Sequence, residues 1–304
     1  MPNLSQRVPD LADVISHLQP RDYLLLRLLA DHKVLTTTQI AAALYSSLRM
    51  CQHRLHQLRQ LDLIDRLRLP RNRRHGGSPP GHWALGRLGY DLHTDPDAPP
   101  VSTRTARHRL GRHAKTPLAH LVGTNGFFTD LLAHARTHPH TALLRWWSEH
   151  ESARRYAGIR PDRIQPDGHG LWHHHDRTVG FWLEYDRSTE NLPRLVGKLG
   201  HYDRLGRSGG PTYPVLFSLD SPAREANLHE ALAGVASRCP IATTARQHAI
   251  TGPAGPVWAL IGHGTTDRLH LHDLDCDHGP DHPANPNWVD GQLTLDQRWC
   301  DYQR

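Results

Sequence analysis

The chain has 304 residues with a formal net charge of +6 at pH 7, enough for two domains with their own cores and basic enough to favour a polyanionic partner. No apolar run approaches the roughly eighteen residues that a membrane span needs, and the N-terminus lacks the basic-then-apolar pattern of a secretory signal. The four cysteines are scattered, which is typical of reduced thiols, so we expect a cytoplasmic protein without membrane contacts.

The first part of the chain predicts three helices followed by a strand, a basic loop and a second strand. Leucines at helical spacing, a Thr-rich cap and an amphipathic stretch define the helices. This order is typical of a winged helix-turn-helix, which we place at residues 1–93. The predicted elements are helices over 21–32, 38–45 and 46–62, strands over 63–69 and 82–85, the basic loop 70–81, and a further helix over 85–93.

The third helix is predicted to pack on the other two through Leu48, Cys51, Leu55 and Leu58. Its opposite face would enter the major groove of double-stranded DNA, where Arg and Gln side chains recognise base edges. The basic loop would contact phosphates or the minor groove. The DNA-binding candidates are Arg49, Gln52, His53 and His56 on the helix and Arg71, Arg73 and Arg74 in the loop. The alternative is a module that contacts proteins, with arginines that are only solvated.

The rest of the chain predicts a linker, a second domain of mixed α/β type and a tail. The linker, 94–117, is rich in Pro, Thr, Arg and His, and the tail, 263–304, is polar and predicted to be loosely ordered. The second domain covers 118–262. Its predicted elements are helices over 118–136, 189–205 and 223–237, a strand or helix end over 142–147, a β-hairpin over 159–187, and strands over 212–220 and 257–262.

Two acids in the predicted hairpin form the candidate chemical site. If the chain reverses between His174 and Arg177, Asp167 and Glu184 face each other with Cβ atoms roughly 5 Å apart. Facing carboxylates repel unless a cation or proton lies between them, and oxygen ligands suit Mg²⁺ or Mn²⁺. The predicted metal ligands are Asp167 and Glu184, with Glu149 and Asp186 as further candidates.

Structural roles remain open for these and for other conspicuous residues. Asp167 could cap a turn, and Glu184 could form an ion pair with Arg194. The histidine run 173–175 lies in the predicted turn, where solvent exposure competes with metal binding. A zinc site in the tail and site roles on the 118–136 helix compete with disorder, core packing and capping. The residues concerned are His270, His272, Cys276 and His278 in the tail and His120 and Asn125 on the helix.

The order of these residues resembles the PD-(D/E)xK nuclease superfamily. It has a Pro-Asp at 166–167, a hairpin, an acid-x-acid from Glu184 to Asp186, then a helix and a strand. In that superfamily two acids hold the metal and a lysine positions the attacking water. Here Asp186 occupies the lysine position, and Lys198 on the following helix is a candidate substitute.

Several blocks between residues 20 and 235 also resemble the replication-relaxation family of plasmid and mobile-element proteins. They include RDYLLLRLL, HWALGRLG and, most specifically, FWLEYDRSTENLPRLVGKLGHY. The resemblance implies an α+β chain in which a winged helix-turn-helix precedes an α/β restriction-endonuclease-like domain. It also implies a role in relaxing or nicking DNA for replication or conjugative transfer. The matching residues of the second domain are Pro166, Asp167, Glu184, Asp186, Thr189, Glu190, Lys198 and Tyr202.

Three hypotheses follow from these patterns. The first is a Mg²⁺-dependent DNA endonuclease or nickase with Asp167, Glu184 and Lys198 as catalytic residues. The second is a non-catalytic replication or transcription regulator, whose second domain serves in homodimer formation or in recruiting replication or transfer proteins. The third makes Tyr202 or Tyr185 a covalent nicking nucleophile.

Overall fold

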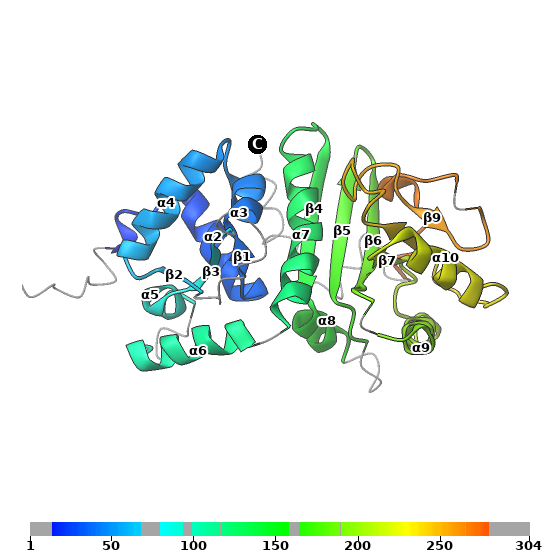
Figure 1. The fold of residues 1–304 in the computed structure, drawn as a ribbon, viewed down its shortest axis with the longest axis horizontal. Helices are drawn as coiled ribbons and strands as arrows, with labels where there is room; N and C mark the ends of the chain where they lie inside the picture. The colour runs from blue at the N-terminus through cyan, green and yellow to red at the C-terminus, as the bar shows by residue number, and fades with distance from the viewer. Residues whose placement is uncertain are drawn as a thin grey trace, which may run out of the picture. The chain divides into compact units, whose positions relative to one another are not determined.

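A computed structural model of the chain confirms the mixed α+β class. It divides the chain into two compact units, Met1–Asn125 and Gly126–Arg304, whose ribbons are drawn in Figure 1. The division falls within helix α7 (Leu118–Ala135). The structure describes residues 14–67, 80–93, 99–115, 117–157, 164–188, 190–264 and 266–279.

Unit 1 joins short helices to a three-stranded antiparallel sheet in the order β1-β3-β2. The predicted cap of the second helix is confirmed: the Gln39 N–H donates to the Thr36 hydroxyl at 3.2 Å, and the Thr36 N–H donates to Gln39 Oε1 at 2.9 Å. The elements are α2 (Pro20–His32), β1 (Leu35–Thr36), α3 (Thr37–Leu44), α4 (Leu48–Gln60), β2 (Ile64–Arg66), β3 (His82–Leu85), α5 (Arg87–Asp91) and α6 (Thr103–Lys115).

Helix α4 is held against the unit by an apolar stripe and by a buried ion pair. Cys51, Leu55 and Leu58 are fully buried, as predicted, whereas Leu48 is 45% exposed. The prediction for Leu48 was wrong because this residue begins the helix, where the neighbouring elements no longer cover it. The Arg54 guanidinium binds the carboxylate of Asp22, whose side chain is 1% exposed.

Residues 103–115 form helix α6, where the sequence predicted only a linker. The Ser102 hydroxyl accepts a hydrogen bond from the Thr105 N–H at 3.1 Å, which caps the helix. Ala106 is buried, and Leu110 packs against the cluster of Val34, Leu67 and Ala84. The polar composition did not indicate this helix, because only about one side chain per helical turn packs against the unit.

Unit 2 contains a six-stranded sheet in the order β4-β5-β6-β7-β8-β9. Strands β4 to β6 are antiparallel, β6 to β8 are parallel, and β9 is antiparallel to β8. Strand β8 was not predicted from the sequence. The elements after α7 are β4 (Thr141–Ser148), α8 (Glu149–Tyr156), β5 (Gly168–His174), β6 (Arg177–Tyr185), α9 (Leu192–Arg207), β7 (Val215–Leu219), α10 (Pro222–Ala231), β8 (Ile241–Ala245), β9 (Ala259–Leu260) and the 3₁₀ turn η1 (Leu271–Asp273).

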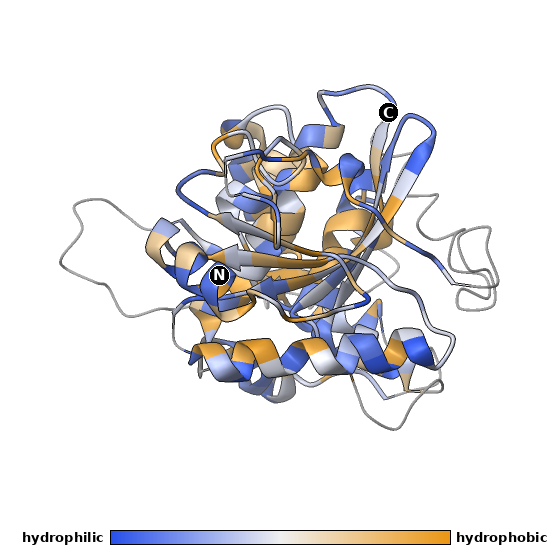
Figure 2. Cartoon of the chain, turned by 90° about the vertical axis from the view of Figure 1, so that its right-hand side faces the viewer, coloured by the Kyte–Doolittle hydropathy of each residue, from blue (hydrophilic) through white to orange (hydrophobic). Residues whose placement is uncertain are grey.

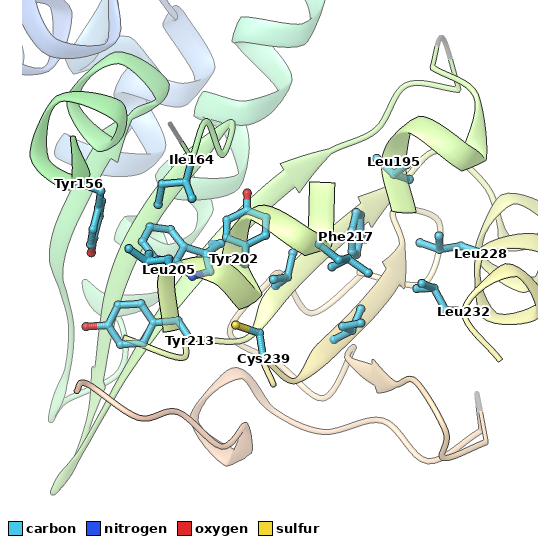
Figure 3. Packing of buried hydrophobic residues seen from close by; sticks show 14 of the residues in the cluster. Tyr156, Ile164, Leu195, Tyr202, Leu205, Tyr213, Phe217, Leu228, Leu232 and Cys239 are labelled. Carbon is cyan, nitrogen blue, oxygen red and sulfur yellow. The ribbon is translucent and has the colours of Figure 1, made fainter. Parts of the chain in front are cut away.

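Helices cover both faces of this sheet. On one face, the ring of Phe128 in α7 stacks on that of Phe181 with centroids 5.9 Å apart. On the other face, Trp182 contacts Tyr156 of α8 and Tyr202 of α9, within the apolar cluster shown in Figure 3. Because both faces are covered, the central strand β7, VLFSL, is buried at every position, and the helices carry both polar and apolar residues (Figure 2).

The hairpin register is confirmed, because His173 pairs with Thr178 and His169 pairs with Trp182. The described part of the polar tail, residues 266–279, is more ordered than its composition predicts. Leu271 and Leu274 are fully buried, and η1 lies against β5 and β6. A few leucines suffice to bind this segment to the sheet. None of the helices in the described ranges could span a lipid bilayer.

Candidate active site

Strands β5 and β6 bring Asp167 and Glu184 to the same place. The last pair of the ladder is Gly168 with Leu183, so the next residues on each strand are Asp167 and Glu184. The Tyr185 N–H donates to Asp167 Oδ2 at 2.7 Å, which fixes the Asp167 side chain beside the end of β6. Asp167 is partly exposed and Glu184 is buried, so the pair lies where the core meets solvent.

Helix α9 supplies the positive charge that faces Glu184. Lys198 Nζ lies 2.7 Å from Glu184 Oε2 and 3.3 Å from Glu190 Oε2, and the Tyr202 hydroxyl donates to Glu184 Oε1 at 2.5 Å. The spacing of four residues places Lys198 and Tyr202 one turn apart on the same face of the helix. The site thus combines two acids, one lysine and one phenol from three consecutive elements.

The environment of Glu184 raises its pKa to about 7. Burial has the largest effect, and the Asp167 charge adds to it, while Lys198 and Tyr202 oppose it. The same charges act on Lys198: burial lowers its pKa, but Glu184 and Asp167 more than offset this and raise it. The Glu184 carboxyl is therefore poised to gain or lose a proton near neutral pH.

We expect the metal-free protein to become less stable as the pH rises, because the folded state then loses the proton of Glu184. Its pKa is about 7 in the folded chain against 4.5 for an ordinary glutamate, so the folded state holds the proton more tightly. The stabilisation is fully present below pH 4.5 and is lost as the pH rises through 7. Urea unfolding should show wild type losing stability relative to Glu184→Gln over this range. A difference independent of pH would contradict the raised pKa.

The other predicted acids have different surroundings. Asp186 accepts from Arg224 Nε at 2.8 Å and from the Ser188 N–H at 3.1 Å, so a cation from α10 already neutralises it. Glu149 is exposed and begins α8, directly after Ser148, which pairs with Gly168. The start of α8 therefore adjoins the start of β5, next to Asp167.

The alternative pairing of Glu184 with Arg194 is not what the structure shows. Arg194 Nε binds Glu190 Oε1 at 2.7 Å instead, and its side chain is 78% exposed. Lys198, which lies four residues after Arg194, is the residue that contacts the buried carboxylate of Glu184. Lys198 was already a candidate from the sequence, whereas the role of Arg224 was not predicted, because no local pattern connects α10 with the end of β6.

Neither tyrosine has the surroundings of an activated nucleophile. Tyr202 is buried, and burial together with the Glu184 charge raises its pKa well above the usual value. Burial also raises the pKa of Tyr185, whose ring lies 4.4 Å from the Arg246 guanidinium carbon. A phenolate is disfavoured at both positions.

Asn125 and three of the candidate histidines make contacts that are typical of structural residues. Asn125 is buried and its amide donates to the carbonyl groups of His32 and Val34. His175 lies in the hairpin turn with a positive φ of 54°, and the imidazoles of His174 and His272 stack at 3.7 Å. Within the described ranges, no group of three or more His, Cys, Asp or Glu side chains is arranged to hold a metal ion.

The predicted DNA-facing side of α4 is exposed to solvent. Its four candidates are all exposed, and Leu48 and Met50 in the first turn are 45% and 52% exposed. The helix sequence contains no acid. The candidates are Arg49, Gln52, His53 and His56; the loop candidates Arg71, Arg73 and Arg74, and also Thr189, lie outside the described residues.

The family assignment rests on most of the chain. Residues 26–215 match the replication-relaxation family, a range that includes α4 and the site around Glu184. The chain belongs to the replication-relaxation family. No curated protein and no solved structure matches it. For this replication-relaxation protein, the family suggests a role in the replication or relaxation of plasmid or mobile-element DNA.

Proposed function

We propose that this replication-relaxation protein binds double-stranded DNA through unit 1 and nicks DNA through unit 2 with a divalent metal ion. The observation that carries the proposal is the meeting of Asp167, Glu184 and Lys198 at one end of β6. These residues come from three separate elements, and the Lys198–Glu184 contact of 2.7 Å joins two of them. A buried acid with a raised pKa beside a lysine, as Glu184 is, is typical of catalytic sites.

The two facing carboxylates suit Mg²⁺ or Mn²⁺. Protein sites for Mg²⁺ usually supply one or two carboxylates, and waters and substrate phosphate complete the shell. Asp167 and Glu184 would hold the ion, and Asp186 is left out because Arg224 already neutralises it. When bound, such an ion would polarise the phosphate and lower the pKa of a water molecule.

The protein's own side chains have distinct roles in this proposal. Tyr202 orients Glu184 through its hydrogen bond, and Lys198 offsets negative charge, first on Glu184 and then on the phosphate. Glu184 must lose its proton before it can bind a cation. Since its pKa is about 7, metal affinity and nicking should both rise with pH up to that value.

Supercoiled plasmid that carries the element's own origin provides the direct test. Protein with Mg²⁺ or Mn²⁺ should convert it to open circles, and EDTA should prevent the conversion. Unchanged supercoils with both ions, under conditions where the protein binds the plasmid, would contradict the nicking proposal.

Unit 1 supports the DNA-binding half of the proposal. The order of α2, β1, α3, α4, β2 and β3, with β3 central in the sheet, is that expected of a winged helix-turn-helix. In this proposal helix α4 is the recognition helix. Arg49 and Gln52 can bind base edges, and the exposed Leu48 and Met50 can contact thymine methyl groups.

Substitutions in the basic loop and on α4 should affect binding differently. Replacing Arg71, Arg73 and Arg74 with Ala should weaken binding to every duplex and lower the salt slope by about one unit per lost phosphate contact. Arg49→Ala or Gln52→Ala should instead relax sequence preference, with roughly 1–3 kcal/mol of discrimination lost. Binding isotherms at several salt concentrations measure both effects. An unchanged slope in the triple variant would refute the wing assignment.

One observation favours a non-catalytic regulator as the alternative. Both oxygens of Glu184 already accept hydrogen bonds, from Lys198 and Tyr202, so the site is satisfied without a metal ion. Calorimetric titration with Mn²⁺ in the presence of DNA separates the two functions. Binding heat and a higher melting temperature support the nuclease, whereas neither at millimolar metal supports the regulator.

A further inference from the structure

Helix α6 presents a basic face that neither the family match nor the predicted site explains. Its sequence, TRTARHRLGRHAK, contains four arginines, one lysine and no acid. Arg104, Arg107, His108 and Arg112 are exposed, and we call these four residues the α6 basic face. Arg104, His108 and Arg112 follow one another at intervals of four, so they lie on successive turns of one side.

The opposite side anchors α6 to unit 1. Ala106 is buried, Leu110 packs on the apolar cluster around Val34, and the Arg109 guanidinium carbon lies 4.6 Å from the centre of the Tyr90 ring. The Val101 N–H, just before the helix, donates to Asp91 Oδ1 at 2.6 Å. The α6 basic face is therefore held on a packed helix and does not belong to an open linker.

The charges on this face have no partner within the described part of the protein. Among those residues, Arg104, Arg107 and Arg112 form no ion pair, whereas Arg27, Arg59 and other surface arginines of unit 1 do. Arg104 and Arg107 are three residues apart and therefore neighbours on the helix surface, so their like charges repel. An external polyanion would relieve this repulsion.

We infer that the α6 basic face binds the phosphates of duplex DNA, in addition to the contacts proposed for α4 and the basic loop. The inference rests on the proposed DNA binding of unit 1 and adds a second, sequence-independent contact to it. Phosphate contacts fix position and supply affinity without reading bases. This surface would increase affinity for all duplexes alike and leave sequence preference to α4.

The test compares charge removed from α6 with charge removed elsewhere in the full-length chain. Replacing Arg104, Arg107 and Arg112 with Ala should lower the slope of log K against log salt by about 2–3. Sequence preference should remain unchanged. The matched control is the triple Ala variant of Arg177, Arg207 and Arg238, which are also exposed and form no ion pair among the described residues; its slope should equal that of wild type. Replacing the three α6 arginines with Lys should keep the slope, because phosphates recognise charge.

Each outcome decides between the inference and its alternatives. If wild type binds duplex DNA but the α6 variant has the same slope of log K against log salt as the control variant, the inference is wrong. The proposed function then stands. If wild type binds no duplex, the proposed function fails and the inference fails with it. Competition against labelled duplex DNA tests for an acidic protein as the partner. If polyglutamate displaces the labelled duplex as effectively as unlabelled duplex of equal charge does, the face is assigned to an acidic protein and the inference is overturned.

Discussion

Asp167→Asn is expected to lower the rate of plasmid nicking by roughly a hundredfold to a thousandfold. The substitution keeps the shape of the side chain, so the hydrogen bond from the Tyr185 N–H can persist. It removes the negative charge of Asp167 beside Glu184, and with it half of the charge that these two carboxylates would offer a divalent ion. The lost interaction, several kcal/mol for a metal-stabilised transition state, sets the expected magnitude. Open-circle formation over time measures it.

Asp176→Asn is the matched control for this substitution. Asp176 lies at the exposed turn of the same hairpin, at its other end, so it tests for general effects on the hairpin. We expect its nicking rate to equal that of wild type. Equal rates for the Asp167 and Asp176 variants would contradict the role of Asp167. A loss of the Mn²⁺-dependent rise in melting temperature only in Asp167→Asn would connect the effect to metal binding.

Asp22→Ala should destabilise unit 1 by about 3–5 kcal/mol, because it leaves Arg54 partly buried without its carboxylate. Asp22 also accepts a hydrogen bond from the Gln19 N–H at 2.7 Å, so the substitution also removes the cap of α2. The ion pair raises the pKa of Arg54, mainly through the side-chain hydrogen bond, so the guanidinium stays charged at any accessible pH. Urea unfolding measures the loss, and α4 should lose its attachment first.

Asp31→Ala on the same helix is the control for Asp22→Ala. Asp31 pairs with Arg27 at 2.6 Å, but both side chains are more than 40% exposed, so the pair should contribute at most about 1 kcal/mol. The double variant Asp22→Ala/Arg54→Met should recover part of the stability, because it removes the unpaired charge as well. Similar losses for Asp22→Ala and Asp31→Ala would show that the Asp22–Arg54 pair does not hold α4.

Elements with local sequence signals were predicted correctly. The helices around Leu25 and Leu55, the Thr36 cap and the register of the 168–185 hairpin follow from side-chain periodicity and turn position, and the structure agrees with each. The same register placed Asp167 next to Glu184, since in an antiparallel ladder one known pair defines all the others.

The partners of these residues depend on how distant parts of the chain pack together. Lys198 rather than Arg194 reaches Glu184, and Arg224 neutralises Asp186 from a helix 38 positions away in sequence. Strand β8 and helix α6 were missed for a related reason. Strand β8 has the sequence IATTA, with two threonines among five residues, and is defined by its pairing with β7. The few apolar residues of α6 are buried only because they pack near the Val34 cluster. These interactions depend on burial and proximity across the chain, and no local sequence pattern encodes them.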